Sequence, residues 1–197
     1  LYSSAASDVY KRQDGLVPLT NPVLLLSGIG MMIAGIVPLA YWQRTRRVGA
    51  TAFIFGGALW VAAIAPKAVI DLALGGLINS WANSTFGALG ALIFISLYVG
   101  VRTGMFESGF SYLAFLKTKL RKATYDEAIG FGLAFGGTEA ILLGISSFLS
   151  ILMFLINPGF VEQIPSAQRE AVLAALNGPS IMVFAPIVER ASTIAVH

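Results

Sequence analysis

The chain of 197 residues is 56% hydrophobic and 12% charged, and its mean hydropathy is +0.78. This balance is far more apolar than that of a soluble domain and predicts a protein whose solvent is lipid. The sequence has no cysteine and one histidine, so disulfides and thiolate metal sites are excluded. The net charge of +3 comes from short basic runs between apolar stretches, which indicates topology signals and no nucleic-acid partner.

The two ends of the chain differ from the rest. Residues 1–14 have no apolar region, so they are not a signal peptide. The letters LYSSAASDVYKRQ are similar to a translated cloning or sequencing adapter, and we expect this segment to lie outside the fold. His197 closes the chain inside an apolar stretch without a turn signal. We therefore expect residues 15–197 to be a single transmembrane helical domain that is truncated at its C-terminus.

Five apolar stretches are counted as membrane spans, because about 20 residues at ~1.5 Å each cross ~30 Å of hydrocarbon. A short amphipathic helix is expected at 165–178, before the last span. The third stretch is too long for one straight crossing and predicts tilt or a kink at Gly100 or Gly104. The fold class is therefore an all-α polytopic transmembrane bundle. The five spans cover about 22–42, 48–65, 86–115, 128–156 and 179–197.

Basic residues between the spans predict the orientation of the chain, because short cytoplasmic loops carry an excess of Lys and Arg. The loops on the opposite side hold only Lys67 and Arg169. We expect an integral membrane protein of a prokaryotic plasma membrane with its N-terminus outside. The basic residues that fall on one side are Arg44, Arg46, Arg47, Lys117, Lys119, Arg121 and Lys122.

Ionisable side chains inside the spans are the candidate functional residues, since each costs a few kcal/mol in the membrane unless it has a partner. Glu139 and Arg190 lie at similar depths, ~17 Å and ~15 Å from opposite faces, and predict a pair near mid-bilayer. Glu107 and His197 lie near the cytoplasmic face and predict a second pair. Glu189 adjoins Arg190 on the last span.

Each pair also has a purely structural interpretation. Glu139 and Arg190 can form a mutually neutralised lock between helices. Glu107 and His197, in a partly wet pocket, can activate a water molecule. Lys67 and Arg102 are expected to extend their charged ends toward the membrane surface.

Glycines spaced four apart predict close helix packing near the two acidic candidates. Gly100 and Gly104 form one such pair in the third span, and Gly132 and Gly136 form another in the fourth. Ordinary helix packing explains both pairs as well as a functional role does.

Two segments carry a resemblance to a known family. Residues 130–142 (GFGLAFGGTEAIL) and 186–197 (PIVERASTIAVH) are similar to YhfC-type intramembrane peptidases, distant relatives of CAAX prenyl endopeptidases and bacteriocin-processing membrane proteases. The resemblance covers about residues 20–197. It implies a glutamic-type endopeptidase that cleaves a membrane-embedded peptide or protein substrate in the lipid bilayer.

The resemblance also implies roles for individual residues. Glu107 would be the general base, and His197 would orient the water or stabilise the oxyanion. Glu139 would line the site, while Glu189 and Arg190 would hold the last helix in register. No cofactor is implied, and a metal is left open, although one histidine makes a stable zinc site unfavourable.

Three positions depart from the family pattern and keep other functions open. A glutamate is expected where Phe106 stands, an arginine where Phe110 stands, and a histidine where Phe135 stands. A catalytically inactive scaffold or immunity-type relative is one alternative. A small transporter or proton relay is another, because intramembrane Glu, Arg and His also mark ion pathways.

Overall fold

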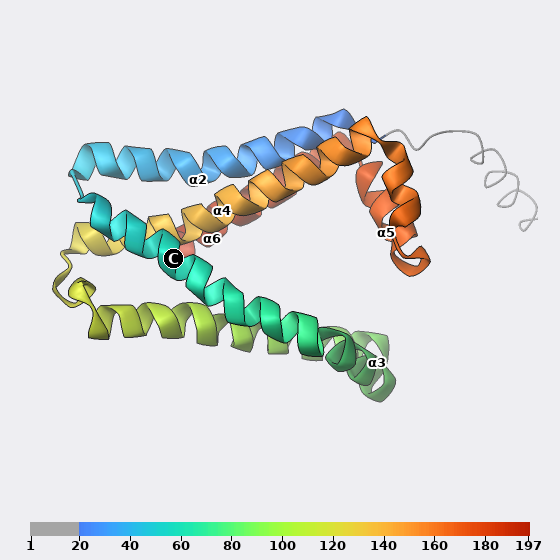
Figure 1. Ribbon diagram of the computed structural model, residues 1–197, viewed down its shortest axis with the longest axis horizontal. Helices are drawn as coiled ribbons and strands as arrows, with labels where there is room; N and C mark the ends of the chain where they lie inside the picture. The colour runs from blue at the N-terminus through green and yellow to red at the C-terminus, as the bar shows by residue number, and fades with distance from the viewer. Residues whose placement is uncertain (1–19) are drawn as a thin grey trace, which may run out of the picture. The chain divides into compact units, whose positions relative to one another are not determined.

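The computed structural model describes residues 20–197, so the adapter-like segment lies outside the described residues. Helices dominate this part of the chain, and residues 20–197 contain no strand. The predicted all-α class is confirmed. In chain order, the elements are η1 (Pro22–Leu24), α2 (Leu25–Arg46), α3 (Ala50–Lys117), η2 (Lys119–Lys122), α4 (Tyr125–Ile156), η3 (Pro158–Gln163), α5 (Ser166–Leu176), η4 (Ser180–Val183) and α6 (Phe184–Val196) (Figure 1).

Three helical stretches are long and apolar enough to cross a membrane, namely Pro22–Arg46, Ala50–Lys117 and Tyr125–Ile156. A fourth candidate is the pair Gln168–Leu176 and Ser180–Val196, which is bent by 98°. The predicted second and third spans both fall within α3. At ~1.5 Å per residue, the 68 residues of α3 are long enough for more than one crossing. The three to four candidate helices are therefore roughly consistent with the five predicted spans.

The long helix α3 is broken at Gly87, where the chain turns back on itself (Figure 1). Gly87 has φ 67° and ψ −179°, a backbone conformation that essentially only glycine adopts. Lys67 lies 20 residues before Gly87, and its partner Glu107 lies 20 residues after it. α3 is therefore a helical hairpin with a first arm before Gly87 and a second arm after it. The predicted kink at Gly100 or Gly104 is wrong, since both of these glycines are helical.

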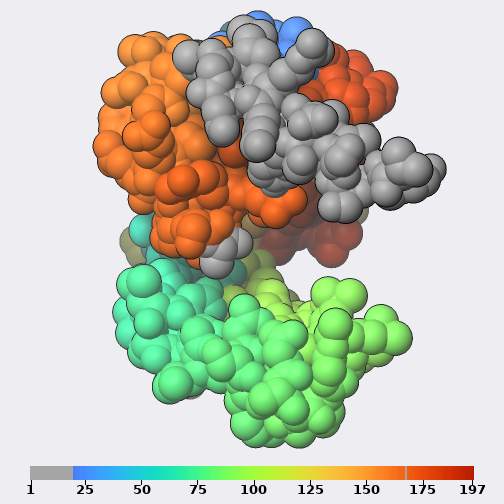
Figure 2. Space-filling model, turned by 90° about the vertical axis from the view of Figure 1, so that its right-hand side faces the viewer, coloured from blue at the N-terminus to red at the C-terminus, as the bar shows by residue number. Residues whose placement is uncertain are grey.

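Aromatic side chains close the turn of this hairpin. The ring of Trp81 on the first arm packs edge-on against Phe86 and Phe94, with centroid distances of 5.4 and 5.3 Å. Phe86 stacks on Phe94 at 5.6 Å. Figure 2 views the molecule from the side on which this turn lies. The aromatic cluster therefore holds the two arms together at the bend.

Replacing Gly87 by alanine is expected to lower the free energy of unfolding by about 1–3 kcal/mol, because a side chain is strained in this conformation. An added Cβ would meet nothing within 4 Å, so the effect comes from the backbone alone. Unfolding by increasing SDS in mixed micelles, followed by circular dichroism, measures the change. Gly75→Ala is the control, because Gly75 is helical and equally open. Equal stability of the two variants would contradict the strained turn.

The contacts divide the chain into two compact units, and the predicted single domain over 15–197 stays a prediction. The first unit comprises, among the described residues, 20–34 and 140–193. Within it, α2 and α4 touch at Gly28 and Gly144, where a Cβ on either glycine would lie 2.6–2.7 Å from the other's carbonyl oxygen. The Asn21 amide donates to the Gly178 carbonyl at 3.1 Å and ties the start of α2 to the α5–η4 connection.

The second unit comprises 35–139 and 194–197, and it holds the candidate catalytic residues. Gly56 of α3 meets the α4 backbone at Phe131, where a Cβ would collide with the carbonyl oxygen. Many large apolar side chains on α3, such as Leu72 and Leu89, are exposed, as expected where lipid is the solvent. The buried core of this unit is Trp60, Ala63, Ala114, Leu120, Phe131 and Phe135.

Candidate functional site

A cavity of about 390 Å³ lies in the second unit, between the second arm of α3, the start of α4 and the end of α6. It combines two ionisable side chains with two serine hydroxyls and an apolar wall. This composition gives a confined, partly polar space inside an apolar helical unit. The lining residues are Glu107, Ser108, Ser111, Phe115, Ala128, Phe131, Gly132, Phe135, Val196 and His197.

Two glycines of α4 allow the end of α6 to approach closely enough to place His197 in this cavity. A Cβ on Gly136 would lie 3.0 Å from the Ile194 Cα and 3.2 Å from the imidazole Cδ2 of His197. A Cβ on Gly132 would collide with the His197 carbonyl oxygen. The close packing predicted for Gly132 and Gly136 is confirmed. Gly100 and Gly104 lack any such neighbour within 4 Å in the described part of the chain.

His197 and Glu107 are brought together as the depth argument predicts. The imidazole Nε2 lies 3.8 Å from Glu107 Oε2 and 4.0 Å from Glu139 Oε2. Both distances are longer than a direct hydrogen bond, and polar groups at this separation are commonly bridged by water. The Phe135 ring packs on the imidazole with centroids 4.9 Å apart, so this residue supports the orientation of His197.

The most buried polar contact of the site joins Glu107 to Lys67 on the first arm of α3. Lys67 Nζ donates to Glu107 Oε1, and the two side chains are 8% and 9% exposed. The expectation that Lys67 extends to the membrane surface is therefore wrong. The sequence spacing predicts this pair only once the turn is known, because a helical hairpin centred on Gly87 brings residues at equal distances from it face to face. Glu107 thus offers one oxygen to Lys67 and the other to His197.

A second ion pair links the two arms nearer the turn. Arg102 Nη1 donates to Asp71 Oδ1, and the guanidinium lies over the Tyr98 ring, 5.5 Å from its centroid. The Arg102 side chain is 11% exposed, so the expectation that it reaches for the membrane surface is also wrong. The hairpin therefore has two charged cross-links, at Lys67–Glu107 and at Asp71–Arg102.

Glu189 and Arg190, the predicted supporting residues, lie on α6 in the first unit and are not among the residues that line this cavity. Arg190 Nη2 donates to the adjacent Glu189 carboxylate. The Thr193 hydroxyl donates to the Glu189 carbonyl at 2.9 Å, one helical turn later. The predicted Glu139/Arg190 pair joins residues of different units and stays a prediction.

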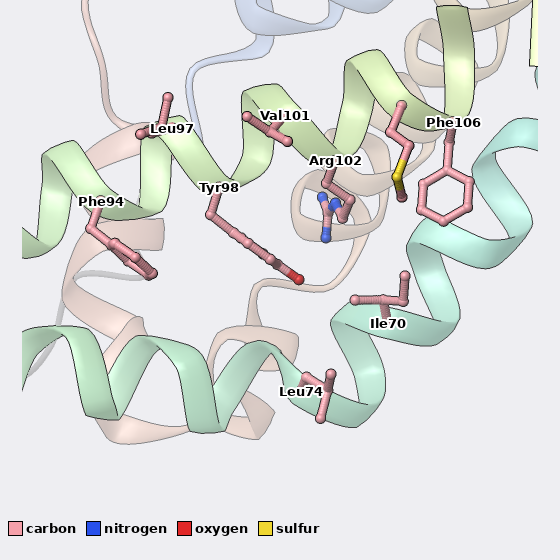
Figure 3. A pocket seen from close by; sticks show the side chains of 9 residues that line it. Ile70, Leu74, Phe94, Leu97, Tyr98, Val101, Arg102 and Phe106 are labelled. Carbon is pink, nitrogen blue, oxygen red and sulfur yellow. The ribbon is translucent and has the colours of Figure 1, made fainter. Parts of the chain in front are cut away.

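A second cavity, of about 490 Å³, lies between the two arms of the α3 hairpin. Figure 3 shows Phe94, Tyr98 and Arg102 extending from the second arm toward the arm that carries Ile70 and Leu74. Arg102 and Tyr98 are the polar side chains among otherwise apolar walls. We call this space the hairpin groove, and its lining is Ile70, Leu74, Phe94, Leu97, Tyr98, Val101, Arg102, Met105 and Phe106.

A metal ion does not fit the side chains as they are arranged. The described residues contain no group of three or more His, Asp or Glu side chains placed to hold one. Two ligand atoms on one tetrahedral zinc ion are roughly 3.3 Å apart, closer than either carboxylate contact of His197. In addition, Glu107 already accepts from the Lys67 ammonium.

A family model described as YhfC intramembrane metalloprotease matches residues 30–197. No curated protein and no solved structure matches the chain. The match spans both units and includes every residue that lines the two cavities described above.

Proposed function

Because the chain belongs to the YhfC intramembrane metalloprotease family, we propose that it hydrolyses a peptide bond of a membrane-embedded substrate in the Glu107–His197 cavity. The observation that carries this proposal is the position of the His197 imidazole, 3.8 Å from Oε2 of the buried Glu107 carboxylate, the oxygen that does not contact Lys67. A base and a hydrogen-bond donor that flank a space for water are the elements that hydrolysis requires.

In the proposed reaction, Glu107 Oε2 takes one proton from a water molecule as the water oxygen bonds to the peptide carbonyl carbon. The His197 imidazole donates an N–H to the oxyanion that forms. The C–N bond then breaks with its electron pair on nitrogen, and Glu107 passes its proton to that nitrogen. The products are a carboxylic acid and an amine. Glu139, 4.0 Å from Nε2, orients the imidazole.

The family description implies a metal ion, whereas Glu107 is held by Lys67 and the His197 imidazole lies 3.8 and 4.0 Å from the two carboxylates. The reaction is therefore written with protein groups alone. This is a glutamic-type mechanism, in which the carboxylate of Glu107 is the base.

The apolar hairpin groove is consistent with a substrate that lies in the membrane. Phe106, at one end of the groove, directly precedes Glu107, and Ile70 lies about one helical turn after Lys67. An apolar segment lying along the groove would therefore reach the cavity that holds Glu107. Apolar walls favour such a segment over a water-soluble peptide.

Filling the groove is expected to slow cleavage without disturbing the catalytic side chains. Val101→Trp adds a large ring to the groove wall and is expected to lower kcat/KM by about tenfold or more, mostly through KM. Leu72→Trp is the control, because Leu72 is 89% exposed on the first arm and does not line the groove. Equal kinetics of the two variants, with a reporter peptide in proteoliposomes, would show that substrate does not use the groove.

The experiment that tests the function itself is cleavage of a reporter protein with one apolar transmembrane segment, co-reconstituted with the full chain. Mass spectrometry of the fragments is expected to show one cut inside or beside that segment. Absence of any cut, across reporters that differ in their apolar segment, would count against peptide hydrolysis.

We also propose that the basic end of the second unit faces the cytoplasm of a prokaryotic cell, with the N-terminus outside. Arg46 at the end of α2 lies 4.0 Å from Asp126 in the first turn of α4, and the Trp42 indole donates to the Asp126 carbonyl at 2.9 Å. The basic η2 segment precedes α4 directly. This gathering of Lys and Arg supports the orientation that short cytoplasmic loops favour.

A further inference from the structure

The site contains a fixed cation that the family description does not account for. Lys67 is among the buried residues of α3, and its ammonium contacts the buried carboxylate of Glu107, which lines the cavity. A buried lysine without a partner destabilises the folded protein, so we expect the Lys67–Glu107 pair to be present whenever the hairpin is folded.

The remaining groups around Glu107 are the kind that bind divalent metal ions. His197 offers an imidazole nitrogen, and Glu107 and Glu139 offer carboxylate oxygens at 3.8 and 4.0 Å from it. Imidazole with two carboxylates is a suitable donor set for zinc. Closing the distance between His197 and Glu107 to that of two ligands on one metal ion requires Glu107 to move away from the Lys67 ammonium, which its other oxygen contacts.

We propose that the Lys67 ammonium is the resident cation of this site and prevents Glu107, Glu139 and His197 from binding a divalent metal ion. The ammonium supplies positive charge to the same carboxylate that a metal would need, and it holds that carboxylate through Oε1. Glu107 remains oriented with its other oxygen toward His197, ready to act on water. The inference rests on the proposed function for the identity of the site, but its consequence is a metal-binding property.

The test measures zinc alone, without any substrate. The full chain in detergent is incubated with zinc chloride, desalted and analysed for metal by mass spectrometry, and its thermal unfolding is recorded with and without zinc. The variants are Lys67→Met, which removes the cation, and Lys67→Arg, which keeps it. Lys119→Met, at an exposed position of η2, controls for the loss of one positive charge.

Wild type, Lys67→Arg and Lys119→Met are expected to retain less than about a tenth of a zinc ion per chain. Lys67→Met is expected to retain about one, with a higher unfolding temperature in zinc, and to lose it when His197→Ala is added. If Lys67→Met does not fold, zinc retention by Lys67→Gln is compared with that of wild type instead, and the same gain of about one zinc ion is expected.

Wild type that retains about one zinc ion, released by His197→Ala, would overturn the inference and leave peptide hydrolysis in place. A folded Lys67→Met that takes up no zinc would overturn it as well. A failure of reporter cleavage, in contrast, would not affect these metal measurements, so the two proposals fail separately.

Discussion

Glu107→Gln is expected to reduce cleavage of a membrane-embedded reporter by at least about 100-fold, because a positioned general base contributes about 10² to 10⁴ to the rate. Glutamine keeps the size of the side chain and a carbonyl oxygen that can accept from Lys67. It cannot take the proton of the attacking water. The loss should appear in kcat, since the substituted group acts in the transition state and the hairpin groove remains intact.

The matched control for this variant is Glu170→Gln on α5, where the carboxylate is exposed and lines neither of the two cavities. It should cleave like wild type. The Glu107 variant also leaves Lys67 buried beside a neutral partner, so its thermal unfolding must be compared. Lys67→Met combined with Glu107→Gln removes both charges, so no unpaired charge is left buried. Loss of cleavage in this double variant then reflects the missing general base and not a loss of folding. A Glu107→Gln chain that cleaves within twofold of wild type would exclude Glu107 as the base.

His197→Ala is expected to lower kcat by about 10² to 10³, the effect of removing one donor to an oxyanion. The imidazole is 22% exposed and lies at the end of α6, so its removal should leave the unfolding temperature nearly unchanged. His197→Gln, which keeps a side-chain N–H, should recover part of the activity. Cleavage rates and unfolding temperatures of these variants in the same detergent check both expectations.

The double variant Glu107→Gln/His197→Ala tests whether the two residues act as a unit. Groups that act together on one water are strongly non-additive, so the double variant should cleave about as slowly as Glu107→Gln alone. A product of the two single effects would instead indicate independent roles, in which His197 only packs against Phe135.

The contact between Glu107 and His197 was predictable because the depth of a residue in the membrane depends only on the start of its span and the rise per residue. Gly132 and Gly136 were predictable for a related reason, since small residues one turn apart permit close helix approach. What the spacing could not indicate is which glycine pair finds a partner. Gly100 and Gly104 have the same spacing, yet they remain open within the described residues.

The Lys67–Glu107 pair escaped prediction because the direction of the chain between them was unknown. The side chains of α3 are apolar on every face of the helix, so no hydrophobic periodicity marks the face on which the two arms meet. The chain has 21 glycines, and only the backbone conformation distinguishes Gly87 as the turn. Once the turn is known, equal spacing on either side of it pairs Lys67 with Glu107.

The missing family residues have different outcomes in the structure. Phe135, in the position where relatives are expected to carry a histidine, is 1% exposed and packs against both Phe131 and His197. It replaces a polar group by core packing that supports the imidazole. Phe110 packs edge-on against Phe106 at the end of the hairpin groove, with centroids 5.8 Å apart. At these two positions apolar rings stand where the expected pattern has polar groups, and Lys67 brings a charge to the site that was not predicted from the sequence.

The most direct test of the central claim is cleavage of the reporter by the reconstituted full chain in water enriched in oxygen-18. Wild type is expected to give two fragments and a new carboxyl group with one oxygen-18 atom from a single attacking water, and Glu107→Gln is expected to form them at least about 100-fold more slowly. The same fragments from the Glu107→Gln chain at a rate within twofold of wild type, or none from wild type, would contradict peptide hydrolysis by a Glu107-activated water.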